Sequence, residues 1–276
     1  MKLKYYFIAI FFTLNFCLVF SQDNCNVFLM KGDSCRYKAC KFLEESPDYF
    51  QLTQKYMEIK DKAIEMCPEY ALVYKQKSTA FLKTGDFINW KTLIDKAVKL
   101  NPKENLNYRG WCRFQFFRDY KGAIQDIEEL DRIVDYDIGY CQNGDYHLNI
   151  AKGLCYKMLG KKVKAIQIIK NQIEKDTTCQ GLYDHLHLGV LFLETNDYEK
   201  AINEFKKQSK INEIAETYYY QALAFKKIKN QEKYSRDIKK AQELYLSKKY
   251  MIDIYTHHID KIYLQDIQNE IEKNQD

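Results

Sequence analysis

DKAIEMCPEYALVY at residues 61–74 and DKAVKLNPKENLNY at residues 95–108 are two versions of one segment. In each, an alanine (Ala63 or Ala97) stands at the same distance before a proline (Pro68 or Pro102), and the prolines are 34 residues apart, from 68 to 102. A fixed period of 34 residues with a helix-ending proline is typical of a solenoid built from pairs of helices. This period predicts a superhelical scaffold that binds another molecule and favours it over a catalyst.

The same pattern recurs further along the chain. In its clearest copy, from about residue 182, Gly189 lies in the expected first helix, Asn196-Asp197-Tyr198 in the turn, and Ala201 and Phe205 in the second helix. Weaker copies begin near residues 71, 104, 146 and 215, and a first one ends at Pro68. In this order of small and aromatic residues the chain resembles the tetratricopeptide repeat.

The resemblance implies an all-α fold, a right-handed superhelical solenoid of about six helix pairs with a C-terminal capping helix. It also implies that Gly153 and Gly189 lie where the two helices of a pair approach closely. The expected organisation is a signal peptide at 1–21, an N-terminal segment at 22–36, a repeat array at 37–245, and a capping helix with a polar tail at 246–276.

The first 21 residues have the pattern of an export signal. Lys2 and Lys4 precede an apolar run at residues 5–20, and small side chains near Ser21 suit cleavage before Gln22. The alternative is a retained membrane anchor, but the run is shorter than the roughly 20 residues that a spanning helix needs. We expect cleavage, no membrane span afterwards, and a periplasmic or secreted protein.

Composition supports a helical, solvent-exposed array. The chain has only 3 prolines and 10 glycines, and its 43 basic and 38 acidic residues alternate as on solvated helix faces. Loss of Lys2 and Lys4 leaves 41 basic residues, a net charge of +3. No basic stripe indicates nucleic-acid binding.

Eight cysteines would remain after cleavage, and their role is open. An exported protein can form disulfides, whereas cysteines in helical repeats also fill small buried positions. No C-x-x-C pair supports a zinc site. The eight are Cys25, Cys35, Cys40, Cys67, Cys112, Cys141, Cys155 and Cys179.

The repeat spacing lengthens to 42 residues once, between the copies that begin near 104 and 146, and the additional residues lie in 135–147. Loops carry function disproportionately, so this stretch is a candidate for a specific contact. The alternative is a lengthened connector with an extra helical turn. A site from Asp137, Cys141, Asp145 and His147 is conceivable, but we expect a polar loop, with no metal and no cofactor.

Two pairs of histidines occur elsewhere, His185/His187 and His257/His258. Their spacing prevents either pair from sharing a metal on a helix.

The resemblance further implies a ligand groove lined by the first helix of each pair. Its best-described form holds a carboxylate with lysine and asparagine; Lys75 matches the lysine, but Thr79 replaces the asparagine, so this mode is not expected. Many groove positions are apolar, which favours a partly hydrophobic partner, and Tyr108, His147 and Tyr183 should then be exposed. The groove residues are Lys75, Thr79, Lys83, Tyr108, Cys112, Gln115, His147, Ile150, Leu154, Tyr183, Leu186 and Val190.

These observations predict a non-catalytic protein–protein interaction scaffold of a bacterial envelope or exterior, which binds a peptide or partner helix of unknown identity. One alternative is an envelope enzyme with a site in 135–147. Another is an assembly factor that binds glycan or lipid through an aromatic groove.

Overall fold

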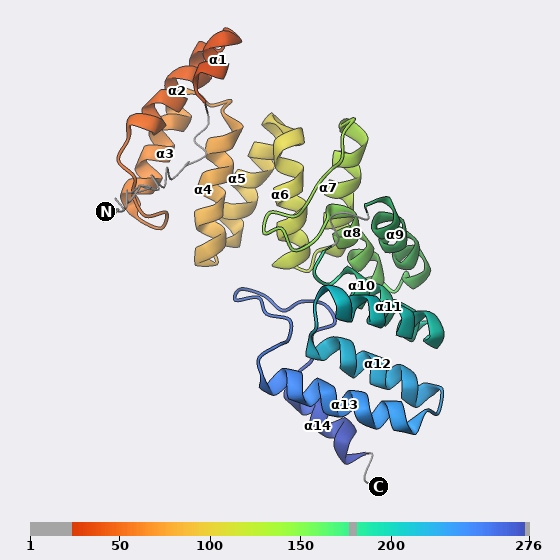
Figure 1. The fold of residues 1–276 in the computed structure, drawn as a ribbon. Helices are drawn as coiled ribbons and strands as arrows, with labels where there is room; N and C mark the ends of the chain where they lie inside the picture. Colours follow the sequence, from red (N-terminus) through yellow and green to blue (C-terminus); the bar gives the residue numbers. More distant parts are fainter. Residues whose placement is uncertain (1–23, 177–180, 274–276) are drawn as a thin grey trace, which may run out of the picture. The chain divides into compact units, whose positions relative to one another are not determined.

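The computed structural model describes residues 24–176 and 181–273, in which every regular element is a helix (Figure 1). These residues form two compact units, one ending at Val73 and the other beginning at Tyr74. The predicted signal peptide, residues 1–21, lies outside the described residues. Across residues 24–176 and 181–273, no helix combines the length and the apolar character that crossing a membrane requires.

The first unit contains α1 (Asn26–Met30), α2 (Ser34–Glu45), α3 (Gln54–Met66) and the first turn of α4. Two disulfides, Cys25–Cys40 and Cys35–Cys67, cross-link it. Its buried cluster is small and consists mainly of cysteine, alanine and aromatic side chains. A core of this size supplies limited stability, and small units of exported proteins commonly gain the remainder from disulfides.

The second unit continues the helix pairs. Within it, both helices of a pair pack against each other, and the second helix also contacts the first helix of the next pair. The pairs are α4 (Ala71–Thr84) with α5 (Phe87–Leu100), α6 (Pro102–Gln115) with α7 (Tyr120–Ile133), α8 (Leu148–Met158) with α9 (Lys162–Lys175), α10 (Asp184–Glu194) with α11 (Tyr198–Ile211), and α12 (Ala215–Lys227) with α13 (Gln231–Leu246).

The turns before α7 and α11 share one mechanism. A residue in the left-handed region (Arg118, φ 54°, or Asn196, φ 63°) reverses the chain after the first helix. The aspartate that follows, Asp119 or Asp197, accepts a hydrogen bond from a backbone N–H in the first turn of the second helix. Such an N-cap satisfies a donor that has no partner within the helix. The aspartates of these two turns therefore set where α7 and α11 begin.

Two glycines allow close packing within their pairs, as the sequence predicted. A Cβ atom added to Gly189 would lie 2.5 Å from Cε1 of Phe205, and one added to Gly153 would lie 2.4 Å from Cγ1 of Ile169. Both neighbouring side chains are fully buried, so they have little room to move away. The close contact of α10 with α11, and of α8 with α9, thus depends on the absence of a side chain.

The predicted C-terminal capping helix is present but is shorter than residues 246–276. The helix α14 covers only Leu264–Glu272 and packs on α12 and α13 at the end of the array. Residues 247–263, here called the C-terminal segment, contain no helix. Three of their apolar residues are buried in two clusters, Met251 and Ile259 in one and Ile262 in the other, whereas Ile252 and Ile254 are exposed. The apolar residues that are spaced as in a helix therefore belong to an irregular segment, and several of them pack against the helices of the array.

Candidate functional site: the inner face and the C-terminal segment

The C-terminal segment turns back from α13 and lies against the first helices of several pairs, α6, α8, α10 and α12, which we call the inner face (Figure 1). At its start, Oε1 of Glu216 on α12 accepts the backbone N–H of Met251 at 3.0 Å. Further along, the amide of Gln115 on α6 donates to Asp253 at 3.2 Å and to Thr256 at 2.5 Å. The segment is thus held at both of these helices by polar side chains.

Asp260 is the central anchor of the segment. Its carboxylate oxygens lie 2.5 Å from Nζ of Lys157 on α8 and 2.7 Å from Nδ1 of His187 on α10. Burial by itself would raise the pKa of Asp260, but the charge of Lys157 and the hydrogen bond from His187 hold it below its usual value. Asp260 also has a left-handed backbone, φ 64°, which is uncommon for a residue other than glycine. The ionised carboxylate therefore ties the segment to two helices of the inner face.

Tyr146 extends this buried network from the other side. Its hydroxyl lies 3.1 Å from Nε2 of His187 and 3.0 Å from Nδ1 of His258. All three side chains are buried, and burial lowers the pKa of His258, which favours its neutral form. Tyr146 follows α7 in residues 134–147, here called the connector, so the network joins the connector, α10 and the C-terminal segment.

The connector contains no extra turn of helix, unlike the alternative considered from the sequence. His147 ends it as the N-cap of α8: its Nδ1 accepts the backbone N–H of Asn149, so its Nε2–H donates to Asp137 at 2.9 Å. This bond to His147, with Lys175 nearby, lowers the pKa of Asp137 to about 2. The interaction holds the connector against α8 and α9. It gives His147 and Asp137 a structural role.

The four connector residues considered as one site do not converge. Asp137 pairs with His147, whereas Asp145 lies near the C-terminal segment. Cys141 is buried, and this burial raises the pKa of its thiol well above the usual range, so it stays protonated and weakly nucleophilic. This arrangement disfavours a thiol-based enzyme in the connector.

The expectation that Tyr108, His147 and Tyr183 are exposed is wrong. Their exposed fractions are 3%, 2% and 8%. The ring of Tyr183 lies 5.1 Å from that of His258, so the C-terminal segment packs against it. The hydroxyl of Tyr108 instead lies 2.9 Å from Oγ1 of Thr79 on α4. These side chains are buried because other helices of the array and, for Tyr183, the C-terminal segment pack against them.

The other predicted groove residues divide by accessibility. Lys83 is exposed, whereas Lys75 and Thr79 are half-buried. The buried members are Cys112, Gln115, Ile150, Leu154, Leu186 and Val190. Among them, Gln115 contacts the C-terminal segment directly.

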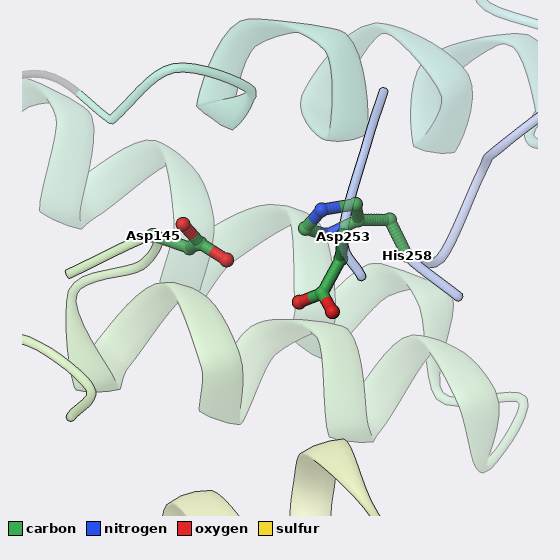
Figure 2. A group of neighbouring side chains, drawn as sticks. All are labelled: Asp145, Asp253 and His258. Atoms are coloured by element: carbon green, nitrogen blue, oxygen red, sulfur yellow. The ribbon is translucent and has the colours of Figure 1, made fainter. Parts of the chain in front are cut away.

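A second group of polar side chains lies where the connector meets the C-terminal segment. Asp145 comes from the connector, and Asp253 and His258 come from the segment (Figure 2). One ligand atom from each of the three lies within 4.8 Å of the others. Burial raises the pKa of Asp145, and the negative charge of Asp253 raises it further.

Sequence reasoning missed most of this site. It considered the histidine pairs only for metal binding within one helix, whereas His187 and His258 act with residues from other parts of the chain. No sequence motif marks Lys157, Asp253 or Asp260. No local spacing predicts these contacts, because they form only when the C-terminal segment returns to the array.

Neither a family model nor a curated protein matches the chain by sequence. Solved structures match it by shape. PilW, a type IV pilus biogenesis factor, aligns with a TM-score of 0.58 at 13% identity over 91% of this chain and 96% of PilW. PilF of Pseudomonas aeruginosa gives 0.56 at 14% identity, covering 89% of this chain and 94% of PilF. YrrB, a tetratricopeptide-repeat protein with an unusual peptide-binding site, gives 0.53 at 17% identity, covering 67% and 91%. Together with the helix pairs, these matches show that this chain has the fold of a tetratricopeptide-repeat solenoid.

Proposed function

We propose that this protein is a non-catalytic interaction scaffold whose inner face binds an extended peptide segment of a partner protein. One observation carries the proposal: the C-terminal segment already lies on α6, α8, α10 and α12 as an irregular chain, held by side chains of those helices. The inner face thus has the geometry and polar groups to bind a polypeptide without a helical partner.

The segment also indicates the chemistry of the partner. Met251 and Ile259 enter the apolar cluster, while Asp260 pairs with Lys157 and His187. A partner that replaces the segment would therefore present aliphatic side chains and a carboxylate at similar spacing. This agrees with the partly hydrophobic partner expected from the sequence. Lys75, Thr79 and Lys83 on α4 would extend the contact beyond the positions that the segment covers.

A display library of extended peptides, panned against the full chain, tests this proposal. We expect enriched peptides with an acidic residue between aliphatic ones, and tighter binding to Asp260→Ala, in which the competing segment is loosened. Fluorescence anisotropy with a labelled peptide gives the affinities. Lys206→Glu, on an exposed position of α11, is the control. Failure to enrich any peptide on either protein, or equal affinity for the wild type and Asp260→Ala, would contradict the proposal.

We place the mature scaffold outside the cytoplasm. Disulfides persist mainly in oxidising compartments, and Cys25–Cys40 and Cys35–Cys67 follow directly after the predicted signal peptide. The resemblance in fold to PilW and PilF is compatible with an envelope role. N-terminal sequencing of protein from fractionated cells should begin at Gln22, with both disulfides formed. An intact Met1 on cytoplasmic, fully reduced protein would contradict export but leave peptide binding open.

A further inference from the structure

Asp145, Asp253 and His258 form a cluster that the peptide-binding proposal does not use. Asp145 belongs to the connector, while Asp253 and His258 belong to the C-terminal segment, and Figure 2 shows the three side chains gathered between these two parts. His258 is 7% exposed and the two aspartates are half-buried. The group thus combines a buried imidazole with two partly desolvated carboxylates.

Among the described residues, no ion pair balances the charges of the two carboxylates in this cluster. Within residues 24–176 and 181–273, no lysine or arginine forms an ion pair with Asp145 or Asp253. The hydrogen bonds that position the carboxylates come from neutral groups: the amide of Asn143 to Asp145, and the amide of Gln115 to Asp253. Two carboxylates facing each other without a cation repel, which a bound divalent ion would reverse.

The ligand set and its second layer fit a metal ion. Zinc binds histidine nitrogen and carboxylate oxygen at about 2.0–2.2 Å in a tetrahedral arrangement, so two of its ligand atoms lie about 3.3–3.6 Å apart. The three ligand atoms here lie within 4.8 Å of one another, so side-chain rotations that move them by roughly 1 Å would bring them to this spacing. Metal-binding histidines usually have a second polar partner that orients the ring, and the Tyr146 hydroxyl, 3.0 Å from Nδ1 of His258, has this position.

We propose that Asp145, Asp253 and His258 bind a divalent transition-metal ion, best Zn²⁺, which fastens the C-terminal segment to the connector. The imidazole favours zinc over Mg²⁺ and Ca²⁺, which prefer all-oxygen sites. Three protein ligands leave a position for water. If the inner face binds a partner peptide as proposed above, the ion also opposes that binding, because it stabilises the competing segment. Metal binding itself does not depend on the peptide proposal.

Metal binding is measured on the full chain after treatment with a chelator, with accessible thiols alkylated so that cysteines cannot take the ion. Titration with Zn²⁺ against a fluorescent zinc indicator should show one site per chain. Asp253→Asn, Asp145→Asn and His258→Ala should each weaken it at least tenfold. Asp137→Asn is the matched control, because Asp137 also pairs with a histidine in the connector but belongs to no three-residue group of the described residues. Mg²⁺ should compete poorly.

Hydrogen exchange tests the fastening separately. Zinc should increase protection of residues 251–262 in the wild type and in Asp137→Asn, but not in Asp253→Asn. Wild-type zinc affinity no better than that of Asp253→Asn, or an equal loss in Asp137→Asn, would overturn the site. Zinc binding without added protection of residues 251–262 would overturn the fastening. Circular dichroism of each variant checks that the loss of zinc binding is not caused by unfolding. None of these measurements uses a peptide, so they test the metal site independently of the peptide-binding proposal.

Discussion

The Nδ1 atom of His187, in the middle of α10, lies 2.7 Å from a carboxylate oxygen of Asp260, which is 73 positions further along the chain. Both side chains are almost completely buried. Through this contact, a segment that follows the repeats becomes part of the inner face of the array, together with Lys157 on α8.

Replacing Asp260 with alanine should release the C-terminal segment. Removing one partner of a buried ion pair typically costs about 3–5 kcal/mol, because the remaining charge has lost its counterion. Lys157 keeps a contact with Glu194 at 3.2 Å, so we expect the lower part of this range. Limited proteolysis should detect new cleavage within residues 247–263. Ile254→Ala is the control in the same segment, since Ile254 is 80% exposed and should change neither stability nor cleavage.

Replacing Gly189 with leucine should destabilise the α10–α11 pair. The side chain would collide with the buried ring of Phe205, and overpacking of this kind typically costs about 1–3 kcal/mol. Denaturant unfolding followed by circular dichroism measures the change. Lys206→Leu, on an exposed position of α11, should be nearly neutral. An equal effect of both substitutions would contradict the close packing at Gly189.

Glu216 should make stability depend on pH. Burial raises its pKa to about 7, more than the hydrogen bond from Met251 and other backbone groups lower it. A carboxyl group with a raised pKa in the folded state destabilises the fold when ionised. Stability should therefore fall as the pH rises from about 4.5 to above 7, by up to about 3 kcal/mol from this group.

Glu216→Gln tests this dependence, because glutamine keeps an acceptor for Met251 N–H and removes the charge. The variant should have a higher melting temperature than the wild type at pH 8 and little difference at pH 5. Glu199→Gln, at an exposed position of α11, serves as the control. A variant that is less stable than the wild type at pH 8 would show that the ionised carboxylate is not the source of the pH dependence.

Replacing Cys35 and Cys67 with serine should affect one unit only. Loss of a native disulfide typically costs about 2–4 kcal/mol, and this one links α2 to the end of α3 in the first unit. Calorimetry should show a low-temperature transition that moves in the variant and a second transition that does not. If both transitions move equally, the two units unfold as one.

The sequence predicted the fold well because its signals are local. The 34-residue spacing of Pro68 and Pro102 predicts the helix pairs, and Gly189 marks a close helix contact that the structure confirms. The site could not be predicted in this way. Tyr183 was expected to be exposed because the repeat places it on the inner face, yet His258 covers it. A repeat pattern in the sequence reflects contacts between neighbouring repeats. It gives no information about a segment that lies far along the chain and packs on the array.

The pairing of the first four described cysteines has a consequence for biogenesis. The two links interleave, since Cys35 lies between Cys25 and its partner Cys40. If the chain is exported from its N-terminus, as proposed above, an oxidase that acts on cysteines in the order in which they emerge would join Cys25 to Cys35, a pair that the native protein does not contain. Correct maturation therefore requires α2 to form before oxidation or an isomerase to exchange the first link. The yield of folded protein should depend on the isomerase capacity of the host as well as on its oxidising power.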